Sequence, residues 1–166
     1  MKKGGANLAN RQTYRAKPPR RWVYRAAMMA ARPTLKLFLG LEIDNQATQG
    51  MKGPAVVVAN HQGMLDFILT AVAFPQWEIS FVASMQYFER RWLRWLLNWM
   101  GAIPKRQFYP DLGAVKSIIA RIRQGGVVGI FPSGQTSMCG VPGPVGDGIG
   151  RLCRKLKAPV VCVHLD

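Results

Sequence analysis

Acidic residues are scarce in this sequence. The 166 residues include 23 Lys and Arg but only eight Asp and Glu, which gives a formal net charge of +15. The first acidic residue is Glu42, and ten of the basic residues precede it. A charge excess of this size predicts an anionic partner, for which nucleic acid and an anionic lipid surface both qualify.

Long hydrophobic runs are also lacking. Between Arg20 and Leu41, apolar residues are interleaved with basic ones, and Pro33 is expected to kink a helix there. No uninterrupted apolar run approaches the roughly 18 residues that a membrane span needs. Residues 20–50 are therefore predicted to form a membrane-associating segment, built on a basic amphipathic helix that lies in the lipid interface. The alternative interpretation is a solvated basic arm followed by a core helix.

Cysteine and histidine are rare, and their spacing predicts no metal site. The three cysteines are an odd number without metal-ligand spacing, so they are interpreted as reduced, cytosolic thiols. Cys162 is expected in the core. Of the two histidines, His164 lies in the apolar run of the last expected strand and is interpreted as a structural residue rather than a ligand.

The remaining pattern divides the chain into three parts. Residues 1–19 are polar, basic and end in prolines, so they are predicted to be a mobile tail. After the membrane-associating segment, residues 51–166 alternate between short apolar runs and helical patterns. Strands are expected at 54–59, 79–83, around Ile103, at 127–131 and at 159–165, and helices at 64–74, 88–100, 111–124 and 147–156. This alternation predicts an α/β fold, a mostly parallel sheet flanked by helices.

The most informative local pattern is the heptapeptide from Asn60 to Asp66, directly after the first expected strand. If His61 lies in the turn and Asp66 in the first helical turn, the carboxylate can reach the imidazole. The carboxylate would then fix the tautomer while the other ring nitrogen takes a proton from a hydroxyl. The alternative is that His61 caps the helix and Asp66 only favours its positive end.

Three further blocks follow in order: Gly101 to Arg106, Phe131 to Gly134, and Ala158 to Val161. Together with the first block they resemble the glycerolipid acyltransferase family, typified by 1-acylglycerol-3-phosphate acyltransferases. The resemblance implies transfer of an acyl group from a coenzyme A or acyl-carrier-protein thioester to a glycerol hydroxyl, at the cytoplasmic face of a membrane and without a further cofactor. It assigns catalysis to His61 and Asp66. The residues that it assigns to substrate binding are Asn60, Lys105, Arg106, Ser133, Gly134, Gln135 and Thr136, with the two cations on the acceptor phosphate.

The third block departs from the family pattern. Family members usually carry Phe-Pro-Glu-Gly-Thr-Arg, whereas this chain has Ser133 in place of the carboxylate and Thr136 in place of the cation. Ser133 can still form hydrogen bonds. Losing a charge-assisted contact of about 1.5 to 3 kcal/mol would weaken acceptor binding by about one to two powers of ten. Family members also usually continue beyond the fourth block, so the chain is expected to be a fragment. Separately, the glycine-rich segment 132–148 is predicted to form a wall of the site.

Two alternatives to an active enzyme stay open. A catalytically impaired lipid-binding relative would explain Ser133 and Thr136, and a nucleic-acid-binding protein would explain the charge, although no stacking motif is present. The tryptophans at 92, 95 and 99 leave a further choice. They either pack a helix on the sheet with its arginines outside, or form a second contact with the membrane interface.

Overall fold

The fold is built on one parallel sheet. The computed structural model describes residues 18–107, 109–134 and 148–166. Its five strands lie in the order β3-β2-β4-β1-β5, and every neighbouring pair is parallel. The strands are β1 (Ala55–Ala59), β2 (Ile79–Ser84), β3 (Ile103–Lys105), β4 (Val127–Ile130) and β5 (Val160–Val163). The prediction of an α/β fold with a mostly parallel sheet is therefore confirmed.

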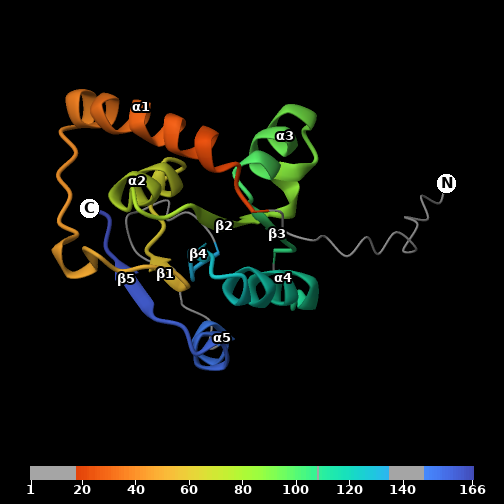
Figure 1. Ribbon diagram of the computed structural model, residues 1–166. Coiled ribbons are helices and arrows are strands. Elements are labelled where there is room, and N and C mark those ends of the chain that lie inside the picture. The colour runs from red at the N-terminus through yellow and green to blue at the C-terminus, as the bar shows by residue number, and fades with distance from the viewer. Residues whose placement is uncertain (1–17, 108, 135–147) are drawn as a thin grey trace.

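Helices cover both faces of the sheet. The α-helices are α1 (Arg21–Leu39), α2 (Asp66–Ala73), α3 (Arg91–Trp99), α4 (Leu112–Arg123) and α5 (Gly148–Leu156), and short 3-10 turns occupy Gln46–Thr48 and Met85–Phe88. Helices α1 and α2 lie on one face, and α4 and α5 lie on the other (Figure 1). A helix that connects two parallel strands must cross over one face of the sheet, so the connecting helices form a layer on each face.

Alternation along β1 supplies both halves of the core. Ala55 and Val57 pack in the cluster under α1 and α2, whereas Val56 packs in the cluster under α4. Because β1 is buried on both sides, its sequence is a continuous apolar run rather than an alternating one. Gly129 of β4 is required at its position, since an added Cβ would lie 2.5 Å from the ring of Phe81.

Helix α1 is tied to the rest of the fold near its start. Val23 and Tyr24 are its buried residues, and the backbone N–H of Ile79 donates to the Tyr24 hydroxyl at 3.2 Å. Burial raises the pKa of Tyr24 to about 12. Glu78 accepts from Arg25 at 2.9 Å and lies 3.5 Å from Arg21. The helix continues through Pro33, and within the described residues no helix is both long enough and apolar enough to cross a bilayer.

Two expectations are corrected at the edges of the fold, and one choice that the sequence left open is narrowed. Cys162 is exposed rather than in the core, because β5 is an edge strand that pairs only with β1. His164 lies beyond the end of β5, is 74% exposed in its side chain and contacts Asp166 at 2.6 Å, so it is not a buried structural histidine. Trp92 and Trp95 are both exposed, so neither belongs to the core.

Candidate active site

The carboxyl ends of the strands bring the candidate residues to one edge of the sheet. His61 follows β1, Phe131 follows β4, and Lys105 ends β3. In open parallel sheets, ligands bind at this edge, where the connecting loops leave the strands. Three of the four sequence blocks therefore meet the same edge, although His61, Lys105 and Phe131 are 26 to 70 residues apart in the sequence.

His61 and Asp66 are in direct contact. The His61 Nδ1 atom lies 2.8 Å from the Asp66 Oδ2 atom, with Asp66 as the first residue of α2. The same Oδ2 atom accepts the backbone N–H groups of Gln62 at 2.6 Å and Gly63 at 2.8 Å. Because those two N–H donors define Oδ2 as an acceptor, Nδ1 donates the proton of the third contact, so in the neutral ring the free lone pair lies on Nε2.

The surroundings hold the carboxylate more firmly than the imidazole. Asp66 is 4% exposed, whereas the His61 side chain is 22% exposed. A partly exposed Nε2 next to a buried orienting carboxylate is the arrangement of a general base with its partner. The capping alternative for His61 is wrong, since Leu65 occupies the N-cap position and no side chain caps α2.

Phe131 packs on the imidazole ring from β4. The ring centroids of His61 and Phe131 are 4.5 Å apart with 25° between the planes, a stacked pair. Phe131 in turn stacks on Phe81 at 5.9 Å, and Phe81 meets Phe67 edge to face. Sequence reasoning identified Phe131 only as part of a block, because no local pattern shows that β4 lies next to β1.

Asn60 joins the end of β1 to the residues that follow β5. Its side-chain amide donates to the carbonyl of Leu165 and its oxygen accepts the Leu165 N–H, both at 2.7 Å. The Gln62 side chain donates to the same carbonyl at 2.8 Å. Both polar atoms of Asn60 are thus used within the fold, and its assignment to substrate binding stays a prediction.

The second block ends on the exposed side of the same edge. Lys105 and Arg106 are both exposed, and the Arg106 backbone N–H donates to Asp111 at 2.9 Å. Asp111 also caps α4 by accepting from Ala114 N–H at 3.0 Å, as the sequence predicts. Burial opposes the ionisation of Asp111, but backbone hydrogen bonds from Arg106, Ala114 and Gly113, and the charge of Arg106, outweigh it and lower its pKa.

A side chain outside the predicted set connects the second and third blocks. Gln107 donates to the carbonyl of Gly134 at 2.9 Å, and the Gly134 N–H closes a turn on the Phe131 carbonyl at 3.0 Å. Gly134 has φ +63°, which favours glycine there. Ser133 precedes it on this turn, while Gln135 and Thr136, with most of the segment 132–148, lie outside the described residues.

Strand order separates the cations from the histidine. Strands β2 and β4 lie between β3 and β1, so the ends of β3 and β1 stand about 14 Å apart at three strand spacings. The turn at Ser133 and Gly134 follows β4 and lies between these two ends. The edge therefore offers an imidazole on one side and exposed cations on the other, with hydrogen-bonding groups between them.

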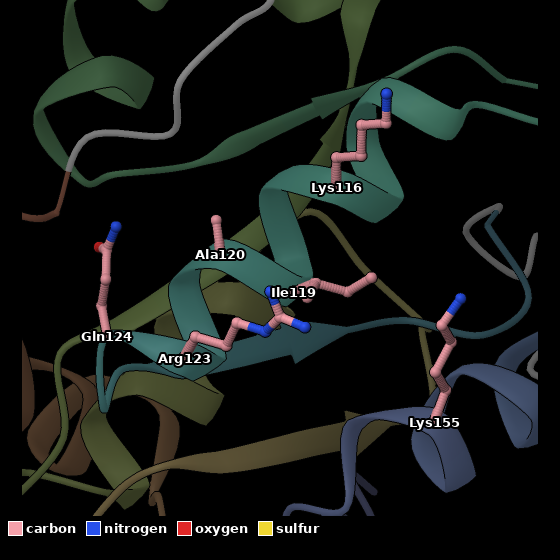
Figure 2. A pocket seen from close by; sticks show the side chains of 6 residues that line it. All are labelled: Lys116, Ile119, Ala120, Arg123, Gln124 and Lys155. Atoms are coloured by element: carbon pink, nitrogen blue, oxygen red, sulfur yellow. The ribbon is translucent and has the colours of Figure 1, made fainter.

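A hollow in the surface lies away from this edge. A depression of about 520 Å³ is lined by Lys116, Ile119, Ala120, Arg123 and Gln124 of α4 and its end, and by Lys155 of α5 (Figure 2). Its helices cover the face opposite to α1 and α2, and none of its residues contacts His61 or Asp66. Among the described residues, no three His, Cys, Asp or Glu side chains converge as metal ligands would.

Comparison with known proteins decides the family. A family model described as Acyltransferase matches residues 40–166, which is more than half of the chain. The chain belongs to this acyltransferase family. The resemblance of the sequence blocks to glycerolipid acyltransferases is confirmed by this match.

Two individual proteins are similar to this acyltransferase-family chain. The 1-acyl-sn-glycerol-3-phosphate acyltransferase of Bacillus subtilis (strain 168) is 27% identical over 139 residues, which cover 84% of this chain and 69% of that protein. The crystal structure of the 1-acyl-sn-glycerophosphate (LPA) acyltransferase PlsC from Thermotoga maritima shares the fold, with a TM-score of 0.67 and 18% identity. That match covers 84% of this chain and 56% of the PlsC chain, so this chain spans little more than half of the solved structure.

Proposed function

We propose that this protein transfers a fatty acyl group from an acyl thioester to the free hydroxyl of lysophosphatidic acid or a related lysophospholipid. The observation that carries the proposal is the 2.8 Å contact between His61 Nδ1 and Asp66 Oδ2 at the carboxyl edge. The names of the Bacillus subtilis and Thermotoga maritima proteins support this acceptor class. Either acyl-coenzyme A or an acyl-carrier protein supplies the thioester.

The reaction needs no covalent intermediate on the protein. His61 Nε2 takes the proton of the acceptor hydroxyl as that oxygen attacks the thioester carbonyl, and Asp66 stabilises the imidazolium that forms. The tetrahedral intermediate collapses with cleavage of the carbon–sulfur bond. The imidazolium then gives its proton to the departing thiolate, so that ester and free thiol leave together.

The acceptor phosphate is bound at the end of the carboxyl edge that lies away from His61. Lys105 and Arg106 bring two exposed cations for the acceptor phosphate, with Arg106 able to bind it through two parallel hydrogen bonds. Ser133 contributes a hydroxyl where family members usually have a carboxylate, and Gly134 a backbone that approaches the acceptor closely. Asn60, Gln135 and Thr136 complete the proposed binding set.

The acceptor is a lipid, so the protein works at a membrane surface. Helix α1 supports this location, because Arg32 and Lys36 lie on the same helix as exposed Met29, Leu37 and Phe38. Basic amphipathic helices of this kind lie in the interface of anionic bilayers. We place the protein at the cytoplasmic face, where its thioester donors are found.

The test is acyl transfer to a panel of lysophospholipids in vesicles, with labelled acyl-coenzyme A or acyl-carrier protein as donor. His61→Ala should lower the rate by at least about a thousandfold, because the base is lost while the fold and the acceptor site remain. His164→Ala is the matched control, since it removes the only other histidine, which is exposed and outside the site. Equal rates for wild type and His61→Ala would exclude His61 as the base.

A second candidate function is supported by Ser133. An impaired relative that binds lysophospholipid without transferring acyl groups would retain vesicle binding and show no transfer with any donor. In that case Ser133→Glu, which restores the usual residue of the family, should create transfer that depends on His61. Transfer by the wild type would exclude this candidate directly.

A further inference from the structure

Helix α3 exposes its tryptophans to an unusual degree. None of its nine residues is buried, and Trp92 and Trp95 are 65% and 63% exposed. Soluble proteins rarely leave several large aromatic side chains uncovered on one short helix. This exposure favours a surface that contacts a partner.

The exposed aromatics continue from α3 onto α1. Trp95 stacks on Trp99 at 5.1 Å, and Trp99 meets Trp22 of α1 edge to face at 6.5 Å. Trp22 is 74% exposed, and the Arg20 N–H donates to the Trp99 carbonyl at 3.3 Å. The two helices stand beside each other in Figure 1, with only a small apolar cavity of about 60 Å³ between them. Trp22, Trp95 and Trp99 thus form one contact cluster. Together with the exposed Trp92 of the same helix α3, they are called here the tryptophan surface.

The charge next to the tryptophan surface is positive. Arg90, Arg91 and Arg94 are exposed, and among the described residues none of them forms an ion pair, although Glu89 precedes them in the sequence. The Arg94 Nε atom donates to the carbonyl of Phe88, which fixes its side chain without neutralising it. The cations near the start of α1 differ, since Arg21 and Arg25 are both paired with Glu78.

We propose that the tryptophan surface and its three arginines are a second contact with the bilayer, made with anionic phospholipids. Indole rings and arginine side chains combine an apolar body with a polar or charged end, which suits the headgroup region. A second copy of this chain fits less well, because its own three arginines would face like charges. This inference rests on the proposed function at a membrane surface. It adds a second membrane-binding surface to the one on α1.

The contact also orients the site. Helix α3 begins after β2 and so starts near the carboxyl edge, where His61 lies, before the chain crosses back to β3. Attachment through α3 as well as α1 therefore brings the carboxyl edge toward the bilayer. A lipid acceptor then reaches His61 without leaving the membrane surface.

The test measures binding of the full chain to vesicles of phosphatidylcholine with and without phosphatidylglycerol. Trp92→Ser, which removes a ring that has no stacking partner among those described, and the double variant Trp92→Ser, Trp95→Ser should weaken binding by about tenfold or more. Arg90→Gln with Arg91→Gln should remove about a fivefold gain from phosphatidylglycerol per charge. The control is Arg123→Gln, an exposed position at the last residue of α4 on the face opposite to α1, which should bind like the wild type.

Each outcome decides between named alternatives. Unchanged vesicle binding by the double tryptophan variant overturns the proposal. So does sedimentation without lipid that shows a wild-type dimer and a monomeric variant, because the surface then belongs to a second copy. Transfer to a short-chain, water-soluble lysophosphatidic acid separates this inference from the proposed function, since the variants should keep the wild-type rate. If the wild type transfers no acyl group at all, the proposed function fails, and vesicle binding alone decides whether the tryptophan surface contacts the bilayer.

Discussion

The carboxyl edge and the tryptophan surface are built in opposite ways. At the edge, one oxygen of Asp66 accepts three hydrogen bonds, and the His61 ring is held by Asp66 on one side and Phe131 on another. On α3, no residue is buried and the tryptophans contact mainly one another. At the carboxyl edge, hydrogen bonds and ring stacking hold the catalytic candidates in one geometry. The tryptophan surface instead presents exposed aromatic side chains that no single partner group holds in place.

This difference follows from what each region must do. A general base must hold one nitrogen within hydrogen-bond reach of one proton, so small displacements lower the rate steeply. A bilayer has no fixed shape, so a surface that binds it needs only enough apolar area and charge. Single-atom changes should therefore be severe at the edge, and several side chains should be needed to change the surface.

The largest effect is expected from Asp66→Asn. The amide keeps an oxygen for the Gln62 and Gly63 N–H groups, so the fold should survive. It cannot stabilise an imidazolium, and the rate of acyl transfer should fall by about 10³- to 10⁴-fold. Steady-state transfer and vesicle binding, measured on the same preparation, check this prediction. The comparison fails if vesicle binding falls in parallel with the rate.

A smaller effect is expected from Phe131→Leu. Leucine keeps an apolar contact but removes the ring that stacks on His61, so kcat should fall about three- to tenfold while KM stays unchanged. Phe131→Tyr keeps the ring and should restore the rate. In nuclear magnetic resonance spectra, loss of the ring current should shift the His61 ring protons, which His164→Ala helps to assign. A rise in KM alone would mean that Phe131 acts on substrate binding instead.

The smallest effect is a difference in pH dependence between the two regions. The folded state lowers the pKa of Asp111, so its stabilising contribution is present above the unfolded value of about 4 and is lost as pH falls through the folded value. Asp111→Ala should cost about 1 kcal/mol at neutral pH through loss of the α4 cap, and less in acid. Denaturant titrations at several pH values check this. The arginines beside the tryptophan surface stay charged over the same pH range, so vesicle binding by the folded protein should not change with pH. If acid weakened vesicle binding as much as it weakens the Asp111 contribution, the two regions would not differ in pH dependence.

Local sequence patterns predicted most of the fold because strands and helices have their own periods. The run from Ala55 to Ala59 and the helical spacing after Asp111 both formed the expected elements. Patterns were weakest where burial depends on neighbours. Cys162 lies in an apolar run but on an edge strand, and Trp92 lies at helical spacing but stays 65% exposed. A short stretch of sequence shows neither where its strand lies in the sheet nor whether another helix or strand packs against it.

The sequence by itself determined the order of the blocks and the strand that precedes His61, and it put His61 and Asp66 close enough along the chain for the contact that the structure shows. That contact is local, since the two residues are five positions apart and the turn between them closes on the carboxylate. Only the tertiary structure decided that Phe131 covers the imidazole, that Asn60 holds Leu165 and that Trp22 joins the α3 tryptophans. These contacts join residues about 70 to 105 apart, and they exist because β1 lies between β4 and β5 and because α1 packs beside α3.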